Sequence, residues 1–268
     1  MKSPKKLTTE EMRTLPYMEL RKYLDTMYPK KTFPPPPPID YKNITFDEAV
    51  KKAGARCTMF ANKMDRDPFS SVLKGLIRKR PQEEKFQFFW STSSPFSQWY
   101  NVSFKAPIFS GGHFVSEWQK VHFGSSEIEF SSAEKYMMLY KSIICGDSLV
   151  ALKIMETDNV RKIKELGRQV SNFDEDVWDF HRIGVVYSAN RYKFNSNPDL
   201  KNMLLDTSPN TLVEAAPNDK IWGIGLAEED ERAKKREKWL GYNLLGEILT
   251  NLREDVIAGK WDEKPQNS

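Results

Sequence analysis

After residue 130, apolar positions recur with the spacing of helices, and capping or helix-stopping residues separate the segments. Gly146 and Gly167 each follow a helical run and are expected to end it, because glycine readily adopts the left-handed conformation that closes a helix. The pattern predicts helices over residues 132–145, 148–156, 159–166, 174–194, 199–205 and 240–258.

Short strands are predicted before and between these helices. The aromatic run Phe86–Trp90 has the composition of a buried strand. Further short strands are expected within 101–130, with glycine turns between them, and near Leu212 and Val213. The sequence therefore predicts an α+β domain over about 86–258, in which orthogonally packed helices predominate and the strands form one small antiparallel sheet.

The front of the chain has a different pattern. A helix is predicted over Thr9–Tyr28, and Thr45–Glu48 reads as a capping box at the start of another. Between them, the five prolines of Phe33–Pro38 impose a stiff polyproline II conformation. This run is either a spacer or a ligand for a polyproline-binding domain of the EVH1, SH3 or WW kind. The basic flank at Lys30 and Lys31 departs from the common EVH1 ligand and favours the spacer.

Composition narrows the class of protein. The chain has 268 residues, of which 39% are hydrophobic and 29% are charged, as expected for a globular protein with a sizeable core. No apolar run approaches the roughly 20 residues of a membrane-spanning helix, and the charged N-terminus lacks the apolar region of a signal peptide. The two cysteines favour reduced thiols in the cytoplasm or nucleus, and no zinc-ligand spacing is present.

Charge divides the chain at about residue 85. Residues 1–85 carry 19 Lys and Arg against 11 Asp and Glu, whereas residues 86–268 carry 22 against 26. We therefore expect a basic, partly disordered extension over 1–85, a folded domain over 86–258 and a tail over 259–268. The extension could meet an anionic partner such as nucleic acid, although its mixed charges favour an ordinary solvated surface.

Glu134 is the first candidate for chemistry. It stands three residues after Ser131, just ahead of an apolar helical run. The spacing favours a capping box, in which the Ser131 side chain accepts the Glu134 amide and the Glu134 carboxylate accepts the Ser131 amide. The alternative is a catalytic carboxylate, because Glu134 shares a helical face with Met138 and Lys141, and an acid beside apolar groups can become reactive.

The loop before the last helix is the second candidate. Asn218 and Asp219 suit an Asx turn, and Gly223 and Gly225 would let the backbone approach a ligand closely. Trp222 lies between the turn and the glycine pair, where it is either a core residue or a platform for a flat base. The glycine pair does not lead from a strand into a helix, which excludes a dinucleotide-binding fingerprint.

Three more residues stand at element ends. Arg168 follows Gly167 and offers a planar fork for phosphate, although a surface arginine after a helix stop would look the same. Trp178 shares a helical face with His181, which favours core packing over ligand contact. Asn243 precedes the apolar positions of the last helix and is its candidate N-cap.

Five motifs in order carry a family resemblance. They are Phe89-Trp90-Ser91 with Pro95-Phe96-Ser97-Gln98-Trp99-Tyr100, then Phe130-Ser131-Ser132-Ala133-Glu134-Lys135-Tyr136, Leu166-Gly167-Arg168, Asn218-Asp219-Lys220-Ile221-Trp222-Gly223 and Asn243-Leu244-Leu245-Gly246. In this order they resemble the NADAR superfamily, whose members include a bacterial N-glycosidase of the riboflavin pathway. Each motif is weak alone, and the five together are specific.

The resemblance implies cleavage of an N-glycosidic bond between a ribose and a nitrogen base, with no metal or other cofactor. It implies that Glu134 is the catalytic carboxylate and that Trp178 and Trp222 stack on the ring. Asp219 is our candidate for a second acid or for a group that holds the ribose hydroxyls. The remaining residues expected to bind substrate are Trp90, Ser97, Trp99, Lys141, Arg168, Gly223, Gly225 and Asn243.

Three functions remain open at this point. The first is an N-glycosidase acting on a ribosylated base or an ADP-ribose-type nucleotide. The second is an ADP-ribose hydrolase acting on modified nucleic acid, which would need a basic groove near Glu134. The third is a non-catalytic adaptor that senses a nucleotide and is recruited through Phe33–Pro38. Ile224 stands where the riboflavin-pathway members carry Asp, so the resemblance indicates the bond but not the molecule.

Overall fold

The computed structural model describes residues 78, 80, 83–107 and 127–260. The predicted helix Thr9–Tyr28, the proline run Phe33–Pro38 and the capping box Thr45–Glu48 lie outside the described residues. So do most of the predicted tail and part of the strand-rich segment 101–130. These expectations, and the domain boundaries at 85 and 258, stay predictions.

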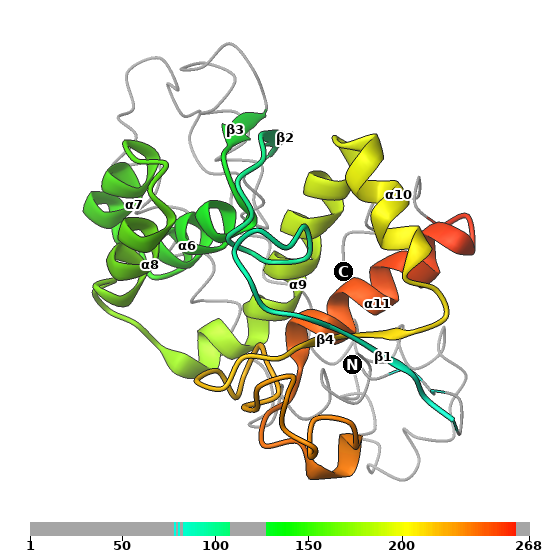
Figure 1. Cartoon of the computed structure of the whole chain (residues 1–268). Coiled ribbons are helices and arrows are strands. Elements are labelled where there is room, and N and C mark those ends of the chain that lie inside the picture. The colour runs from blue at the N-terminus through cyan, green and yellow to red at the C-terminus, as the bar shows by residue number, and fades with distance from the viewer. Residues whose placement is uncertain (1–77, 79, 81–82, 108–126, 261–268) are drawn as a thin grey trace, which may run out of the picture. The chain divides into compact units, whose positions relative to one another are not determined.

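Six α-helices are the main elements of the described chain. They are α6 (Ala133–Ile144), α7 (Ser148–Met155), α8 (Val160–Arg168), α9 (Glu175–Asn195), α10 (Pro198–Asp206) and α11 (Leu244–Ile257), with a short 3-10 helix η1 (Arg236–Lys238). Figure 1 shows α6, α7 and α8 on one side of the long α9, and α10 and α11 on its other side. The predicted α+β fold, mainly helical, is confirmed. Among the described helices, none combines the length and apolar character needed to cross a bilayer.

Helix α6 lies at the centre of the first helix group. It packs against α7, α8 and α9, and every residue of this helix except the partly exposed Lys141 is buried. A helix that is covered on all faces belongs to the core. Its polar side chains must therefore find partners inside the protein, as Ser142 does by donating to the Leu139 carbonyl at 2.7 Å. Glu134, in the first turn, is buried by the same packing.

The described strands form two pairs. Strands β2 (Phe104–Ala106) and β3 (Ile128–Phe130) are antiparallel, as predicted, with Phe104 opposite Phe130. Strands β1 (Phe86–Phe89) and β4 (Thr211–Glu214) pair in parallel, which the sequence analysis did not predict. A parallel pair needs a long crossover connection, and here helices α6 to α10 provide it.

The start of α11 fixes the end of β4. Asn243 occupies the predicted N-cap position with a left-handed backbone (φ 55°), but its side chain caps no helix amide. Its Nδ2 donates to the Leu212 carbonyl at 3.0 Å, and its Oδ1 accepts the Glu214 amide at 2.9 Å. The helix begins at Leu244, later than predicted, because the amides of Leu244 and Leu245 donate to the carbonyls of Ile221 and Trp222 and not to carbonyls four residues earlier.

Gly167 has a packing role and does not end its helix. Helix α8 continues to Arg168, so the predicted stop at residue 166 is wrong. A Cβ atom on Gly167 would lie 2.0 Å from the Met138 sulfur, which shows how closely α8 approaches α6. Gly146 behaves as predicted and follows the end of α6 with a left-handed backbone (φ +69°).

Candidate functional site

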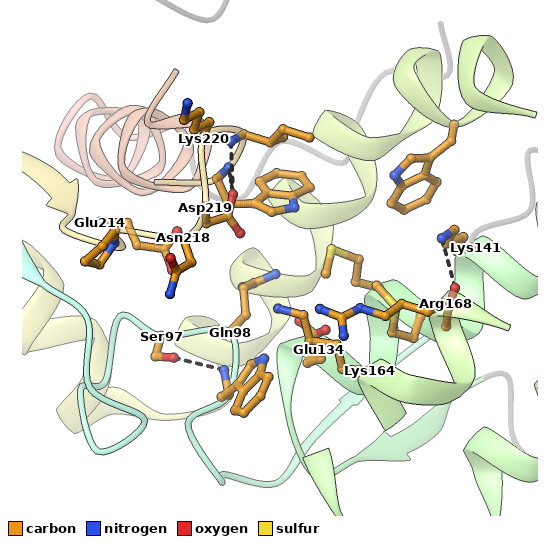
Figure 2. A pocket seen from close by; sticks show the side chains of 18 residues that line it. Ser97, Gln98, Glu134, Lys141, Lys164, Arg168, Glu214, Asn218, Asp219 and Lys220 are labelled. Carbon is orange, nitrogen blue, oxygen red and sulfur yellow. Dashed lines mark hydrogen bonds between the residues drawn. The ribbon is translucent and has the colours of Figure 1, made fainter. Parts of the chain in front are cut away.

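A cavity of about 750 Å³ lies between helices α6, α8 and α9 and the loop that follows β4 (Figure 2). Its wall contains residues 97–99 after β1, side chains from α6, α8 and α9, Glu214 at the end of β4, and residues 217–222. The predicted site residues that line it are Ser97, Trp99, Glu134, Lys141, Arg168, Trp178, Asp219 and Trp222. The fold therefore brings most of the predicted site together from distant parts of the chain.

The helix cap leaves the Glu134 carboxyl available to the cavity. Ser132, not Ser131, is the N-cap, and its side chain accepts the Lys135 amide at 3.2 Å. The Glu134 amide donates to the Gln98 carbonyl at 3.0 Å. The capping box predicted for Ser131 and Glu134 is therefore wrong, and no hydrogen bond within the described residues ties the Glu134 carboxyl to its own helix.

Burial controls the acidity of Glu134, whose exposed fraction is 3%. Loss of solvation raises the pKa of Glu134 to about 7, and the charge of Asp219 contributes to the rise. Lys164, a hydrogen bond from Trp99, and Arg168 partly oppose it. Glu134 is thus poised to change its protonation state near neutral pH, as a general base must.

Gln98 presents a fixed donor beside Glu134, and the sequence analysis missed it. The two hydrogens of Asn190 Nδ2 are used by Gln98 Oε1 and by the Val186 carbonyl, both at 2.8 Å. These bonds settle which end of the Gln98 amide is oxygen. Gln98 Nε2 then remains buried without a hydrogen-bond partner among the described residues, in a residue that lines the cavity.

Three indoles contribute to the cavity wall. Trp178 of α9 is 7% exposed and Trp222 is partly exposed, and both line the cavity, as the resemblance implied. Trp99 lies beneath the Lys164 ammonium, which is 5.2 Å from its ring centroid. Trp90 is 62% exposed and lines an adjoining hollow of about 410 Å³ instead. Aromatic walls of this kind suit a flat ring.

Four cations line the same cavity. Lys164 and Arg168 stand one helical turn apart on α8, and Lys220 belongs to the loop after β4. The fourth, Lys141, donates to the Gly167 carbonyl at 2.9 Å and lies 4.2 Å from the ring centroid of Phe173. Burial lowers the pKa of Lys141, although Cys145 and Glu134 oppose this. Lys164 was missed, but its spacing from Arg168 was a usable signal.

The loop after β4 has the predicted Asx turn. Asp219 Oδ1 accepts the amides of Ile221 at 2.9 Å and Trp222 at 2.8 Å, which holds Trp222 in place. Gly223 leaves no room for a side chain, because a Cβ atom there would lie 2.8 Å from both the Glu214 carbonyl and the Ala216 Cβ. This glycine is needed for packing of the loop.

Besides Trp90, three residues expected to touch substrate are not part of the cavity wall. Gly223 and Gly225 support the loop, and Gly225 has a left-handed backbone (φ +70°). Asn243 is buried and bridges to β4. Ile224 is also fully buried, in an apolar cluster with Val213, so its substitution for Asp does not remove a group from the cavity wall.

The available side chains suit proton transfer and charge stabilisation. Within the described ranges, no three or more His, Cys, Asp or Glu side chains are placed to hold a metal ion. A carboxyl at Glu134 can accept a proton, the indoles can hold a flat ring, and the cations can attract an anion. The expectation that no cofactor is needed stays a prediction.

Comparison with known proteins gives one family. The family model described as "NADAR domain" matches residues 88–257. N-glycosidase R617 of Acanthamoeba polyphaga mimivirus is 45% identical over 151 residues, which cover 54% of this chain and 89% of that protein. Protein irg-1 of Caenorhabditis elegans is 35% identical over 174 residues, covering 64% and 79%. N-glycosidase YbiA of Escherichia coli is 33% identical over 95 residues, covering 35% and 52%.

Proposed function

The chain belongs to the NADAR family, and from this we propose that its cavity cleaves the N-glycosidic bond of a ribosylated nitrogen base. Two of its relatives carry the name N-glycosidase, and this general activity is that of the chain. The observation that carries the finer proposal is Glu134, a buried carboxyl that no ion pair engages within the described residues, in a cavity walled by indoles.

Bond cleavage places positive charge on the anomeric carbon of the ribose as the base departs. An ionised Glu134 beside that carbon stabilises the charge, and the low dielectric of a buried site strengthens the effect. The helix start adds a favourable field, because Glu134 lies in the first turn of α6, near the positive end of the helix dipole. The ionised form of Glu134 is therefore the active one.

The attacking water needs an acceptor and a donor. Glu134 accepts one of its protons, and Gln98 Nε2 donates to its oxygen, so the two groups together fix its orientation. Their relative position is held by the bond between the Glu134 amide and the Gln98 carbonyl. Gln98 therefore positions the water, and Glu134 removes its proton.

Indoles and cations are suited to bind the other parts of the substrate, the base and the phosphate. Trp178 and Trp222 are suited to hold the base by stacking. Arg168 and Lys164 are suited to hold a phosphate on the ribose, because their charges lie together on one helix face. The substrate class is thus a ribosylated base phosphate or an ADP-ribose-type nucleotide.

The test is release of free base from N-ribosides. We expect purified protein to release base from at least one ribosylated nucleotide, measured by chromatography over a panel of nucleotides and flavin precursors. Glu134→Gln should lower turnover about 10²- to 10⁴-fold, because the amide can neither carry the negative charge nor accept the proton.

Glu165→Gln is the matched control. Glu165 is an exposed glutamate on α8, next in sequence to Lys164, and it does not line the cavity. It should retain wild-type turnover. Retained activity in Glu134→Gln, with circular dichroism unchanged, would remove Glu134 from the reaction.

ADP-ribosylated nucleic acid is a second candidate substrate, favoured by the four cations that line the cavity: Lys141, Lys164, Arg168 and Lys220. It predicts that an ADP-ribosylated oligonucleotide is cleaved faster than the free nucleotide and that raised salt weakens this preference. Equal rates at all salt concentrations would favour the small molecule. The adaptor hypothesis depends on Phe33–Pro38, outside the described residues, and stays a prediction.

A further inference from the structure

Glu214 lies at the carboxyl end of β4 and lines both the main cavity and the adjoining hollow. Its main chain is held on both sides: the amide donates to Asn243 Oδ1 at 2.9 Å, and the carbonyl accepts the Ile224 amide at 3.0 Å. Parallel pairing of β4 with β1 adds a third constraint. The side chain is therefore rigidly presented to the cavity, and neither the motif pattern nor the resemblance had singled it out.

One oxygen of the Glu214 carboxyl lacks a hydrogen-bond partner in the described part of the chain. Oε2 is shielded from solvent and has no hydrogen-bond partner among the described residues. A shielded polar atom without a partner is uncommon in a folded protein, and in a cavity wall it marks a place where a ligand atom can bind. Figure 2 shows Glu214 and Asp219 on one side of the cavity, and Glu134, Lys164 and Arg168 on the other.

The surroundings of Glu214 keep its proton bound. Burial raises the pKa of Glu214 to about 8; Asp219 and Glu134 add to the rise, and Lys164 opposes it. At neutral pH Glu214 is thus largely a neutral carboxylic acid, able to donate a hydrogen bond, while Glu134 is more easily ionised.

We propose that Glu214 is the general acid of the reaction, donating its proton to the nitrogen base as the base leaves the ribose. The role rests on the proposed function. The bond from the anomeric carbon to nitrogen breaks, its electron pair stays on the base, and that nitrogen or a conjugated ring atom takes the Glu214 proton. Water adds to the anomeric carbon and gives a proton to Glu134. Transfer of one proton from Glu134 to Glu214 through solvent restores both groups.

Asp219 is less suited to the same role. Its Oδ1 already accepts two amides of its own loop, so this oxygen is engaged in the Asx turn and is not available to a departing base. Its negative charge instead helps Glu214 to keep its proton. Asp219 thus helps Glu214 to act as the acid by raising the pKa of Glu214. The loop turn uses Oδ1 of Asp219 and not Oδ2.

The pH profile is the first test, measured with the N-riboside that the wild type turns over fastest. An acid must be protonated to act, so wild-type kcat/KM should fall as pH rises through about 8. Glu214→Gln should lower kcat about 10²- to 10⁴-fold and lose this alkaline limb, because the amide has no proton to give. Glu165→Gln should keep the wild-type profile.

A measurement without substrate guards against a variant that fails to fold. In wild-type protein with ¹³C-labelled glutamate carboxyls, one carboxyl signal absent from Glu214→Gln should titrate near pH 8. Titration of Glu214 at its ordinary pKa near 4.5 would overturn the proposal. So would an unchanged alkaline limb in a folded, active Glu214→Gln variant. A wild type that releases no base from any riboside would instead overturn the proposed function itself, and the acid role with it.

Discussion

Two groups of glutamates in this protein are withdrawn from water, and only one of them is paired with cations in the described part of the chain. In the first group, Glu247 of α11 is fully buried between Arg80 at 2.7 Å and Arg236 at 2.6 Å. Arg236 also binds Glu84, just before β1. The second group is Glu134 and Glu214 in the cavity, which form no ion pair with any described residue.

Pairing with a cation decides whether the pKa of a buried glutamate ends above or below its ordinary value. Loss of solvation would raise the pKa of Glu84, but hydrogen bonds from Arg236 and Thr211 outweigh it and lower that pKa. In the cavity, burial is not offset in this way, and the pKa rises to about 7 for Glu134 and about 8 for Glu214. The paired group holds the residues just before β1, Arg80 and Glu84, against α11 through ion pairs. The unpaired group is ready to exchange protons.

The largest expected effect comes from breaking the paired group. Glu247→Gln should lower the free energy of unfolding by about 3 kcal/mol, because two largely buried guanidinium groups lose their shared carboxylate. Urea unfolding at pH 7 measures this loss.

Glu254→Gln is the comparison, since Glu254 pairs with the same Arg80 at 2.6 Å but its side chain is 35% exposed. It should cost less than about 1 kcal/mol. Equal losses for the two variants would show that burial does not set the value of these pairs.

The unpaired group should make stability depend on pH in a defined direction. Because the folded-state pKa values of Glu134 and Glu214 lie above the ordinary 4.5, the folded protein binds more protons than the unfolded chain between pH 4.5 and 8. The contribution of these groups to the free energy of unfolding therefore falls as pH rises through that window. For Glu134 the fall is at most about 3 kcal/mol.

The double variant Glu134→Gln with Glu214→Gln should lose this contribution, measured by urea unfolding at pH 5, 6.5 and 8. The difference from wild type is the quantity to compare, because burial lowers the pKa of Lys193 to about 7 and acts in the opposite direction above that pH. Parallel pH curves for wild type and double variant would contradict the assignment of raised pKa values.

The smallest effect on the free energy of unfolding is expected for the exposed ion pair between Arg78 and Asp255. Arg78 is 41% exposed and contacts Asp255 at 2.9 Å. Arg78→Gln should cost about 0.5 kcal/mol, and 1 M salt should abolish the difference, because exposed pairs are screened. A loss as large as that of Arg80→Gln, measured in parallel, would mean that exposure does not separate the two arginines.

Local signals were sufficient for most of the secondary structure. The apolar spacing after residue 130 located all six described helices, and Gly146 correctly marked the end of α6. The errors arose where a residue serves a distant partner: Gly167 makes room for Met138, and Asn243 bridges to β4 instead of capping its helix. Capping and stopping rules consider only neighbours in sequence, so they cannot detect such partners.

In the candidate site, some residues could likewise be selected from the sequence and others only from the structure. The family resemblance carried by the five motifs selected Glu134, Trp178 and Trp222, and all three line one cavity in the fold. Gln98 and Glu214 became visible only in three dimensions, because their distinguishing feature is a buried polar atom without a partner. Burial and partnership are set by segments that meet on folding, and the same glutamate is an ion-pair partner in one place and a proton donor or acceptor in another.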